Sequence, residues 1–356
     1  MSRQLREITL DLTPRVRIDI IDVAARVSEQ YGNVLQDYRK TLCCSFHTTA
    51  GYLEQRLCAR LGHRKRQLGQ FIRVFQKLFP PNAGYSHDCM RLRHELSESE
   101  KERESINGDS HLTFMSAGLK NCVTYVNTPK LPIYFIDLDG VYKHYHRTRH
   151  TTILAYNQEE HVYYGTFSIP VPPEYPINAF NLKDPRYGLF THLNDLIASY
   201  GIEKGRIDLR LVSEEHHAGL TVNEYETMLM RNDLPEALRN PLRYMVQRGK
   251  KLLHNPASIP AKTRDYAVYD LIYLYNEVMD NIQLGRSAID RAMAYVSAPA
   301  ARIFRLKRQI SLLISNSVEP GPGRIVQGTY QSPILLQYQS TPKGFRGLEI
   351  TLWNFA

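Results

Sequence analysis

Three histidines lie in sequence contexts that suit metal binding. His47 opens the run His-Thr-Thr-Ala-Gly, His87 is followed by an aspartate, and His111 closes the run Asn-Gly-Asp-Ser-His. Neutral imidazole is the commonest protein ligand of divalent metals, and three such ligands with one open position describe a catalytic zinc site. We therefore expect His47, His87 and His111 to bind a divalent metal, zinc first, with magnesium as the alternative. The alternative is a hydrogen-bonded structural role, which is the commoner one for any single histidine.

Two aspartates and several hydroxyl or amide side chains accompany these histidines. Asp88 and Asp109 are each placed in the sequence to accept a ring proton, which would fix the tautomer of a metal-bound histidine. We expect both to take part in catalysis through this orienting role. Hydroxyls together with backbone amides can hold a phosphate group. The residues expected to bind substrate in this part of the chain are Thr48, Thr49, Asn107 and Ser110.

The elements that must position these residues are predicted twice along the 356 residues. The first set is a strand at 3–12, a helix at 16–28 and a strand at 39–46; the second is a strand at 176–180, a helix at 189–200 and a strand at 207–212. Each set leads into Ala-Gly, at Ala50-Gly51 and Ala218-Gly219, with a helix expected after it, to about Leu61 and over 222–230. The repeat predicts an α+β fold with two homologous domains, each a mixed, largely antiparallel sheet with flanking helices.

The boundary between the two copies is predicted at the proline cluster 170–175, because proline cannot continue a helix or a central strand. This gives one domain at 1–170 and a second at 171–356. Apolar residues at helical spacing over 265–295 have no counterpart in the first copy. We expect them to form a helical insertion, as a buttress, a lid or an interaction element.

The histidine motifs resemble those of a known family. His-Thr-Thr-Ala-Gly, a later His-Asp, and Asn-Gly-Asp-Ser-His before a helix of small residues are similar to motifs of the YjbQ-like family, identified as secondary thiamine-phosphate synthases. In the second copy, 219–224 (GLTVNE) and 323–331 (GRIVQGTYQ) resemble two further motifs of that family. The resemblance implies an α+β fold with a large mixed sheet, trimeric assembly, and a metal bound near the histidines.

Each copy lacks a part of the family pattern that the other copy has. Arg56 stands in the first copy where the family has a glutamate, and Glu215 replaces the first histidine in the second copy. We therefore expect one active site assembled from both copies, with Glu224 as general base. The alternative for Glu224 is an ordinary acid at a helix N-terminus. The second copy is also expected to supply Gln327, Thr329 and Gln331 for substrate binding.

Composition limits the class of protein. Apolar residues make up 43% and charged residues 23%, and no apolar run reaches the length of roughly 18 residues that a membrane-spanning helix needs. The N-terminus lacks a signal-like apolar stretch, so we expect a cytoplasmic protein. The net charge of +9 favours anionic partners. The 5 cysteines form no C-x-x-C pair and are expected to be reduced thiols.

These observations favour a metal-dependent enzyme that acts on a phosphorylated small molecule, a transferase similar to thiamine-phosphate synthases and a homo-oligomer. That reaction joins a pyrimidine pyrophosphate to a thiazole phosphate and releases pyrophosphate. One alternative is a non-catalytic metal-binding, ligand-binding or scaffold protein derived from the family. A nucleic-acid-associated protein is the last alternative, since only the positive charge supports it.

Overall fold

A computed structural model describes residues 5–94, 96–173, 177–226, 228–240, 243–245, 247, 306–317 and 321–356. The chain forms two compact units. The first, here the sheet unit, consists of Met1–Gln55, Leu119–Tyr225 and Leu306–Ala356; the second, here the helical unit, consists of Arg56–Gly118 and Glu226–Arg305. No helix in the described ranges is both long and apolar enough to span a bilayer. The predicted insertion at 265–295 lies outside the described residues.

The sheet unit contains a four-stranded antiparallel sheet in the order β1-β9-β3-β5. Its strands are β1 (Arg6–Leu12), β9 (Arg149–Tyr156), β3 (Lys40–Ser45) and β5 (Cys122–Val126). Helix α1 (Val23–Tyr31) covers one face, where Val23 and Val27 pack against Cys43 and Ile153. This helix starts at Asp22, whose carboxylate accepts a hydrogen bond from the Ala25 N–H at 3.2 Å, as an N-cap does.

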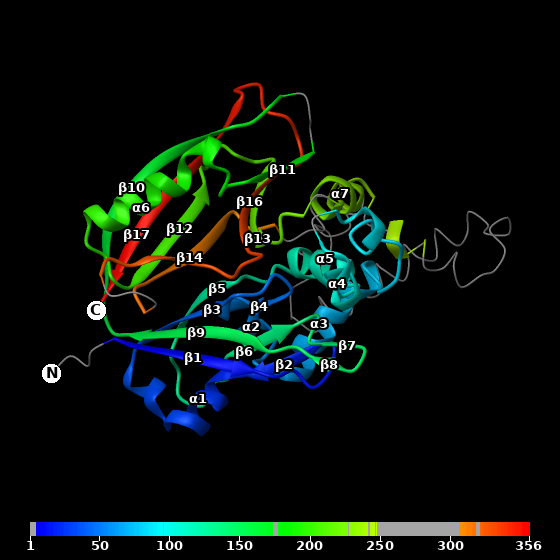
Figure 1. Ribbon diagram of the computed structural model, residues 1–356. Helices are drawn as coiled ribbons and strands as arrows, with labels where there is room; N and C mark the ends of the chain where they lie inside the picture. The colour runs from blue at the N-terminus through cyan, green and yellow to red at the C-terminus, as the bar shows by residue number, and fades with distance from the viewer. Residues whose placement is uncertain are drawn as a thin grey trace, which may run out of the picture. The chain divides into compact units, whose positions relative to one another are not determined.

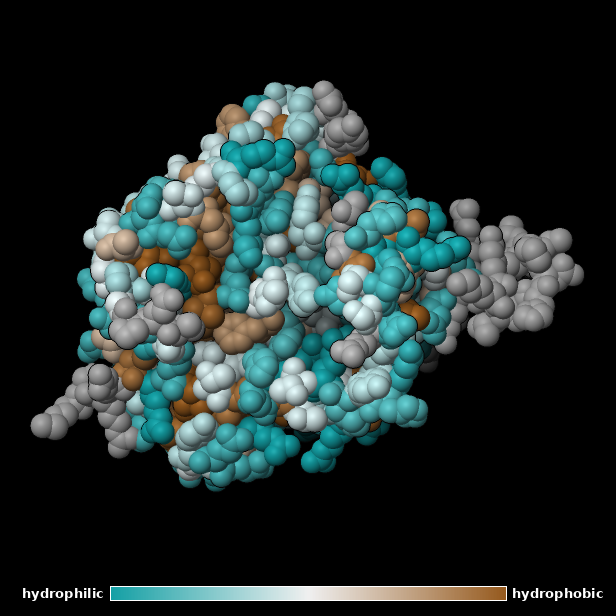
Figure 2. Space-filling view, viewed as in Figure 1, coloured by the Kyte–Doolittle hydropathy of each residue, from teal (hydrophilic) through white to brown (hydrophobic). Residues whose placement is uncertain are grey.

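A five-stranded antiparallel sheet has the order β10-β17-β12-β14-β15. Its strands are β10 (Glu159–Pro170), β17 (Phe345–Phe355), β12 (Gly205–Leu211), β14 (Gln309–Ser315) and β15 (Arg324–Val326). Helix α6 (Leu189–Ser199) packs Leu189, Leu193 and Ile197 against one face of this sheet. Figure 2 shows hydrophobic side chains gathered around this sheet, while most of the rest of the visible face is hydrophilic.

The two sheets pack face to face through their remaining apolar faces. Leu42 and Tyr156 of the four-stranded sheet share a buried cluster with Leu313 and Phe355 of the five-stranded sheet, and the rings of Tyr156 and Phe355 stack at 3.9 Å. The sheet unit therefore has α1 and α6 outside and two sheets inside (Figure 1). Side chains alternate between the two faces of a strand, so β3 supplies Cys43 to one core and Leu42 to the other.

Two three-stranded antiparallel sheets extend the unit, in the orders β2-β6-β4 and β11-β16-β13. The strands are β2 (Asp19–Asp22), β6 (Tyr134–Asp137), β4 (Ala50–Tyr52), β11 (Asn178–Asn181), β16 (Ser332–Gln337) and β13 (Ala218–Asn223). When the strands from β1 to β9 and the strands from β10 to β17 are taken in chain order, they occupy the same positions in the orders of their sheets. Strand β15 is an additional strand at the edge of the five-stranded sheet. Smaller elements are the pair β7 (Val141–Tyr142) and β8 (Tyr145–His146) and the 3-10 turns η1 (Val34–Asp37) and η3 (Pro185–Tyr187).

The helical unit contains the connection from β4 to β5 and part of that from β13 to β14. Its elements are α2 (Gln55–Arg60), which starts at the last residue of the sheet unit, α3 (Lys65–Leu78), η2 (Met90–Leu92), α4 (Glu98–Arg103), α5 (Gly108–Ala117), the π-helical turn η4 (Leu229–Asp233) and α7 (Leu234–Arg239). Helix α3 turns Leu68, Phe71 and Ile72 inward and packs against α5. Helix α5 is buried along its whole length and ends at Gly118, whose φ of 72° suits a glycine C-cap.

The α+β class and its antiparallel sheets are as predicted. The first helix was predicted too early, because residues 19–22 form β2 and α1 starts only at Val23. The helix predicted over 222–230 is wrong at its start, because β13 extends to Asn223 and pairs with β16. Cys44 and Cys122 face each other on β3 and β5, and the expectation that the cysteines are reduced thiols stays a prediction.

Candidate functional site

The loop that carries His87 is fixed by one buried carboxylate. Asp233, at the end of η4, accepts hydrogen bonds from the backbone N–H groups of Ser86 and His87, each at 2.8 Å. The hydroxyl of Tyr244 donates to the same carboxylate at 3.0 Å. Burial raises the pKa of Asp233, and these donors oppose that rise. Sequence reasoning missed Asp233, since nothing in its local pattern distinguishes it.

The His87 imidazole is fully buried and has a polar partner at each nitrogen. Nδ1 lies 3.2 Å from Oε2 of Glu226, and Nε2 lies 3.0 Å from Oδ1 of Asn107. Burial alone would raise the pKa of Glu226, but hydrogen bonds from His87 and from the Met228 and Leu229 N–H groups lower it below its ordinary value. The ionised carboxylate therefore accepts a hydrogen bond from Nδ1–H, which leaves the Nε2 lone pair directed at Asn107.

This arrangement fits a cation. With the proton on Nδ1, Nε2 of His87 and Oδ1 of Asn107 are two acceptors at 3.0 Å. A metal ion or a proton must bridge two such lone pairs, unless the Asn107 amide turns over. For an ion bound about 2.1 Å from both atoms, the angle Nε2–ion–Oδ1 would be roughly 90°, which is ordinary for divalent metal coordination.

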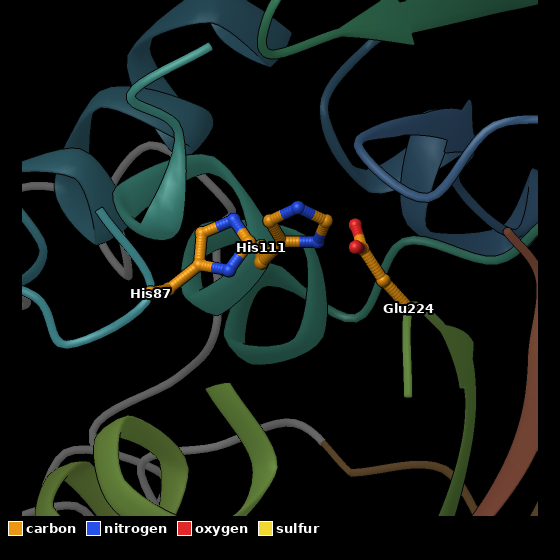
Figure 3. Close-up of side chains that lie close together, drawn as sticks. All are labelled: His87, His111 and Glu224. Atoms are coloured by element: carbon orange, nitrogen blue, oxygen red, sulfur yellow. The ribbon is translucent and has the colours of Figure 1, made fainter. Parts of the chain in front are cut away.

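His111 lies beside His87 on the inner side of α5. The two rings are edge to face, with centroids 5.0 Å apart and planes at 79° (Figure 3). A ring nitrogen of each histidine lies within 4.8 Å of the other, close enough to bind one ion after a small adjustment. The helix can approach the loop because Gly108 has no side chain; a Cβ there would be 2.9 Å from Cβ of Tyr85.

The two predicted orienting aspartates take different places. Oδ1 of Asp88 accepts the Gly108 N–H at 2.9 Å, at the start of α5, and the place predicted for Asp88 at His87 is occupied by Glu226. Asp109 is buried in the first turn of α5, and its role at His111 stays a prediction. Ser110 is buried in the same turn, where Asp88 already holds one of the N–H groups that a phosphate would use.

His47 lies in the sheet unit, just after β3. Its Nε2 accepts the His150 N–H at 2.7 Å, which places the ring proton on Nδ1. Burial, and then the charges of Arg149, His150 and Arg147, lower the pKa of His47 to about 3. The ring is therefore neutral at physiological pH, but binding a metal through Nε2 would require the loss of the His150 hydrogen bond. The metal-ligand role of His47 stays a prediction.

Two motif residues from the second half of the chain hold the loop around His47 through hydrogen bonds. Nε2 of Gln331 donates to the carbonyls of Ser45 and His47, at 2.9 and 3.0 Å, and Nδ2 of Asn223 donates to the carbonyl of Thr48 at 3.2 Å. Gln331, predicted to bind substrate, is thus committed to holding this loop.

The remaining predicted substrate residues are more dispersed. Oγ1 of Thr49 lies 3.4 Å from a guanidinium nitrogen of Arg149. Thr329 is exposed, and Nε2 of Gln327 is buried without a partner among the described residues. The substrate-binding role of these residues stays a prediction.

Glu224 directly follows β13, so the alternative of a helix N-terminal acid does not hold for it. Its backbone N–H donates to the Asn223 side chain at 2.8 Å. Two peptide units span at most about 7 Å, so its Cα stays within that distance of the Cα of Glu226, the residue that contacts His87. Glu226 was missed in the sequence, although the close pair of acids Glu224 and Glu226 was visible there.

No family model and no curated protein matches the chain. Among solved structures, a YbjQ-like protein of unknown function from Sulfolobus solfataricus is 14% identical, over 55% of this chain and 99% of its own, with a TM-score of 0.29. A hypothetical protein from Aeropyrum pernix is 14% identical over 54% and 98%, with a TM-score of 0.27. An uncharacterized yjbq/upf0047 family protein from Clostridium acetobutylicum is 12% identical over 53% and 98%, with a TM-score of 0.24.

Proposed function

We propose that this chain is a metal-dependent enzyme that acts on a phosphorylated small molecule. The observation that carries the proposal is the buried array in which Glu226 fixes the tautomer of His87 and directs Nε2 at Oδ1 of Asn107. His87 and His111 are the proposed protein ligands of a divalent metal, with Asn107 beside them. Zinc suits the imidazoles, and magnesium is the alternative if a pyrophosphate substrate supplies oxygen ligands.

The proposed reaction is the transfer suggested by the sequence motifs, in which pyrophosphate leaves a pyrimidine carrier and a thiazole phosphate takes its place. A bound metal would neutralise the charge that develops on the leaving group. Glu226 keeps His87 oriented, and the fully buried rings keep water away from the array. Glu224 is the proposed general base, since chain continuity holds it near Glu226. Its carboxylate would accept a proton from the amino group of the pyrimidine as pyrophosphate leaves, and would return it once the thiazole nitrogen has bonded to the carbon.

We also propose that the chain is two tandem copies of one fold. The shared strand orders support this: β1-β9-β3-β5 corresponds to β10-β17-β12-β14, and β2-β6-β4 corresponds to β11-β16-β13. On this reading the second copy starts at β10, earlier than the proline cluster at 170–175. The 265–295 region would then belong to a connection, β13 to β14, that has a counterpart in the first copy.

The proposed site draws on both copies. His87 lies on the connection between β4 and β5, and Glu226 lies on the connection between β13 and β14. In a duplicated chain, a site between two copies exists in two versions, and only one must be kept. Each copy can then lose the half that it no longer supplies, as Arg56 and Glu215 suggest.

Metal analysis of the purified protein is the first test. We expect about one zinc or one other divalent ion per chain, lost in His87→Ala and retained in His144→Gln, which changes an exposed histidine. Wild-type protein free of stoichiometric metal, prepared without chelator, would contradict the proposal. The second test is the release of pyrophosphate from a pyrimidine pyrophosphate and a thiazole phosphate. Metal without turnover would favour the non-catalytic alternative. Light scattering would show whether the chain forms the trimer that the motifs suggest.

A further inference from the structure

A buried arginine occupies corresponding places in the two proposed copies. Arg149 begins β9, and Arg346 lies at the start of β17; each is only 4% exposed. The last residue pair between β3 and β9 is Ser45 with Thr151, and the last pair between β12 and β17 is Leu211 with Leu348. Each arginine therefore lies two residues before the end of the same strand pairing.

In the first copy, the arginine is neutralised from the neighbouring small sheet. Nε and Nη2 of Arg149 donate to the two carboxylate oxygens of Asp137, at 2.7 and 2.9 Å. Nη2 also donates to the carbonyl of Asp139 at 2.8 Å. The His47 ring lies next to this guanidinium, with Nδ1 3.5 Å from Nη1. A bidentate aspartate thus supplies the one negative charge that this buried cation needs.

In the second copy, the arginine is neutralised from the loop instead. Nη1 of Arg346 donates to Glu215, and Nε donates to Oε1 of Gln337 at 3.1 Å. Glu215 is 4% exposed, and its other oxygen accepts the Gly347 N–H at 3.2 Å. Gln337 is buried and uncharged, so it supplies an acceptor without a second charge.

The carboxylate that neutralises the arginine lies on a strand in the first copy and on a loop in the second copy. Asp137 is paired with Ala50 across β6 and β4, and Gln337 is paired with Ala218 across β16 and β13. His47 and Glu215 each precede those alanines by three residues. The strand position holds Asp137 in one copy and Gln337 in the other, while the loop position holds His47 in one and Glu215 in the other.

We infer that Arg149 and Arg346 are equivalent positioning residues, and that the carboxylate at Asp137 leaves position 47 open to a side chain other than a carboxylate. This rests on the proposed tandem copies. A buried guanidinium is costly without a carboxylate, and a second buried carboxylate would itself be unpaired. The carboxylate can stand at the strand position or at the loop position. Only the copy that has it on the strand, at Asp137, can have another type of side chain in the loop. The second copy therefore keeps its loop as a permanent structural contact.

Reciprocal substitutions test the exchange. Glu215→Gln should lower Tm by roughly 6–12 °C, because it leaves Arg346 without its charge partner. Adding Gln337→Glu, which keeps the shape of the glutamine, should recover most of that loss. In the first copy, Asp137→Asn should be destabilising and His47→Glu should recover it. Glu29→Gln, which removes an exposed partner of Arg26, serves as the control and should leave Tm unchanged.

Both double variants, Asp137→Asn/His47→Glu and Glu215→Gln/Gln337→Glu, should regain the Tm that their single variants lose. If neither double variant is more stable than its destabilised single variant, the carboxylate positions are not equivalent and the inference is overturned. The recovery of Tm in the double variants does not depend on metal binding. Failure of the proposed function would therefore show separately, as normal recovery of Tm together with a wild-type protein that has no turnover.

Discussion

Glu226 holds Nδ1 of His87 at 3.2 Å across a separation of 139 residues in the chain. Both groups are buried, and the pair fixes which ring nitrogen can bind an ion. Replacing Glu226 with glutamine keeps the shape and removes the charge. We expect metal affinity to fall by about 10–100-fold, as for other carboxylates that orient a metal-bound histidine.

Competition with a chelator of known affinity would measure this change. The matched control is Glu236→Gln, which alters a half-buried carboxylate of the same unit that pairs with Arg243. Equal metal affinity in Glu226→Gln and wild type would mean that His87 does not depend on this partner.

Asp233 should matter for the stability of the His87 loop rather than for chemistry. In Asp233→Asn, one of the two oxygens that accept the Ser86 and His87 N–H groups becomes a donor. We expect a loss of about 1–3 kcal/mol in the free energy of unfolding, the cost of a buried donor left without an acceptor. Thermal unfolding measures the loss, and hydrogen exchange should become faster at residues 86 and 87. Asp195→Asn on the exposed side of α6 is the control; equal effects of the two changes would contradict the assignment.

The sequence predicts regular elements well where local pattern and packing agree. Helix α6 was predicted over 189–200 and observed at Leu189–Ser199, since its apolar positions form one buried face. The helix predicted over 222–230 is wrong at its start because Val222 and Asn223 pair with the distant strand β16. Pairing between strands that are far apart in sequence overrides local periodicity, and no local pattern discloses it.

The candidate site was predictable only in part. His87 and His111 could be selected by their motifs and do lie together. Glu226 and Asp233 could not be assigned to His87, because their contacts form only when two distant connections pack together. Gln331 was selected by its motif, but its side chain is used to bind the carbonyls of Ser45 and His47.

Gly328 should tolerate no side chain. A Cβ at this position would lie 1.9 Å from the carbonyl oxygen of Phe46, one residue before His47. Gly328→Ala must therefore displace the His47 loop or its own turn, and we expect a lower Tm together with changed NMR signals at His47. Thr329→Ala, at an exposed neighbouring position, should change neither. Unaltered signals in Gly328→Ala would show that the two segments are not in contact.

His47 should remain neutral far below the pH at which an ordinary histidine is protonated. Its pKa is lowered to about 3, whereas the unfolded chain has a value of about 6.5. Between these values the unfolded state binds a proton that the folded state does not. Stability from this group is therefore present above about pH 6.5 and is lost as the pH falls toward 3. Nitrogen chemical shifts of His47 would report its protonation, and His47→Gln should flatten the dependence of Tm on pH in this window. A titration midpoint near 6 would contradict this prediction.

Glu224 gives the sharpest test of the proposed chemistry. It lies immediately after β13 and two residues before Glu226, so the chain itself holds it near the residue that orients His87. If it acts as general base, Glu224→Gln should bind metal as tightly as the wild type and lose turnover by about 10²–10⁴-fold, the usual contribution of a positioned base. His87→Ala should lose metal and turnover together. Loss of both in Glu224→Gln would make Glu224 a ligand instead of a base, since an amide is a much weaker ligand than a carboxylate. Glu214→Gln, an exposed acid on the loop before β13, is the control and should preserve both properties. Turnover in Glu224→Gln within about twofold of the wild type would exclude the role of general base, because an amide cannot accept the reacting proton.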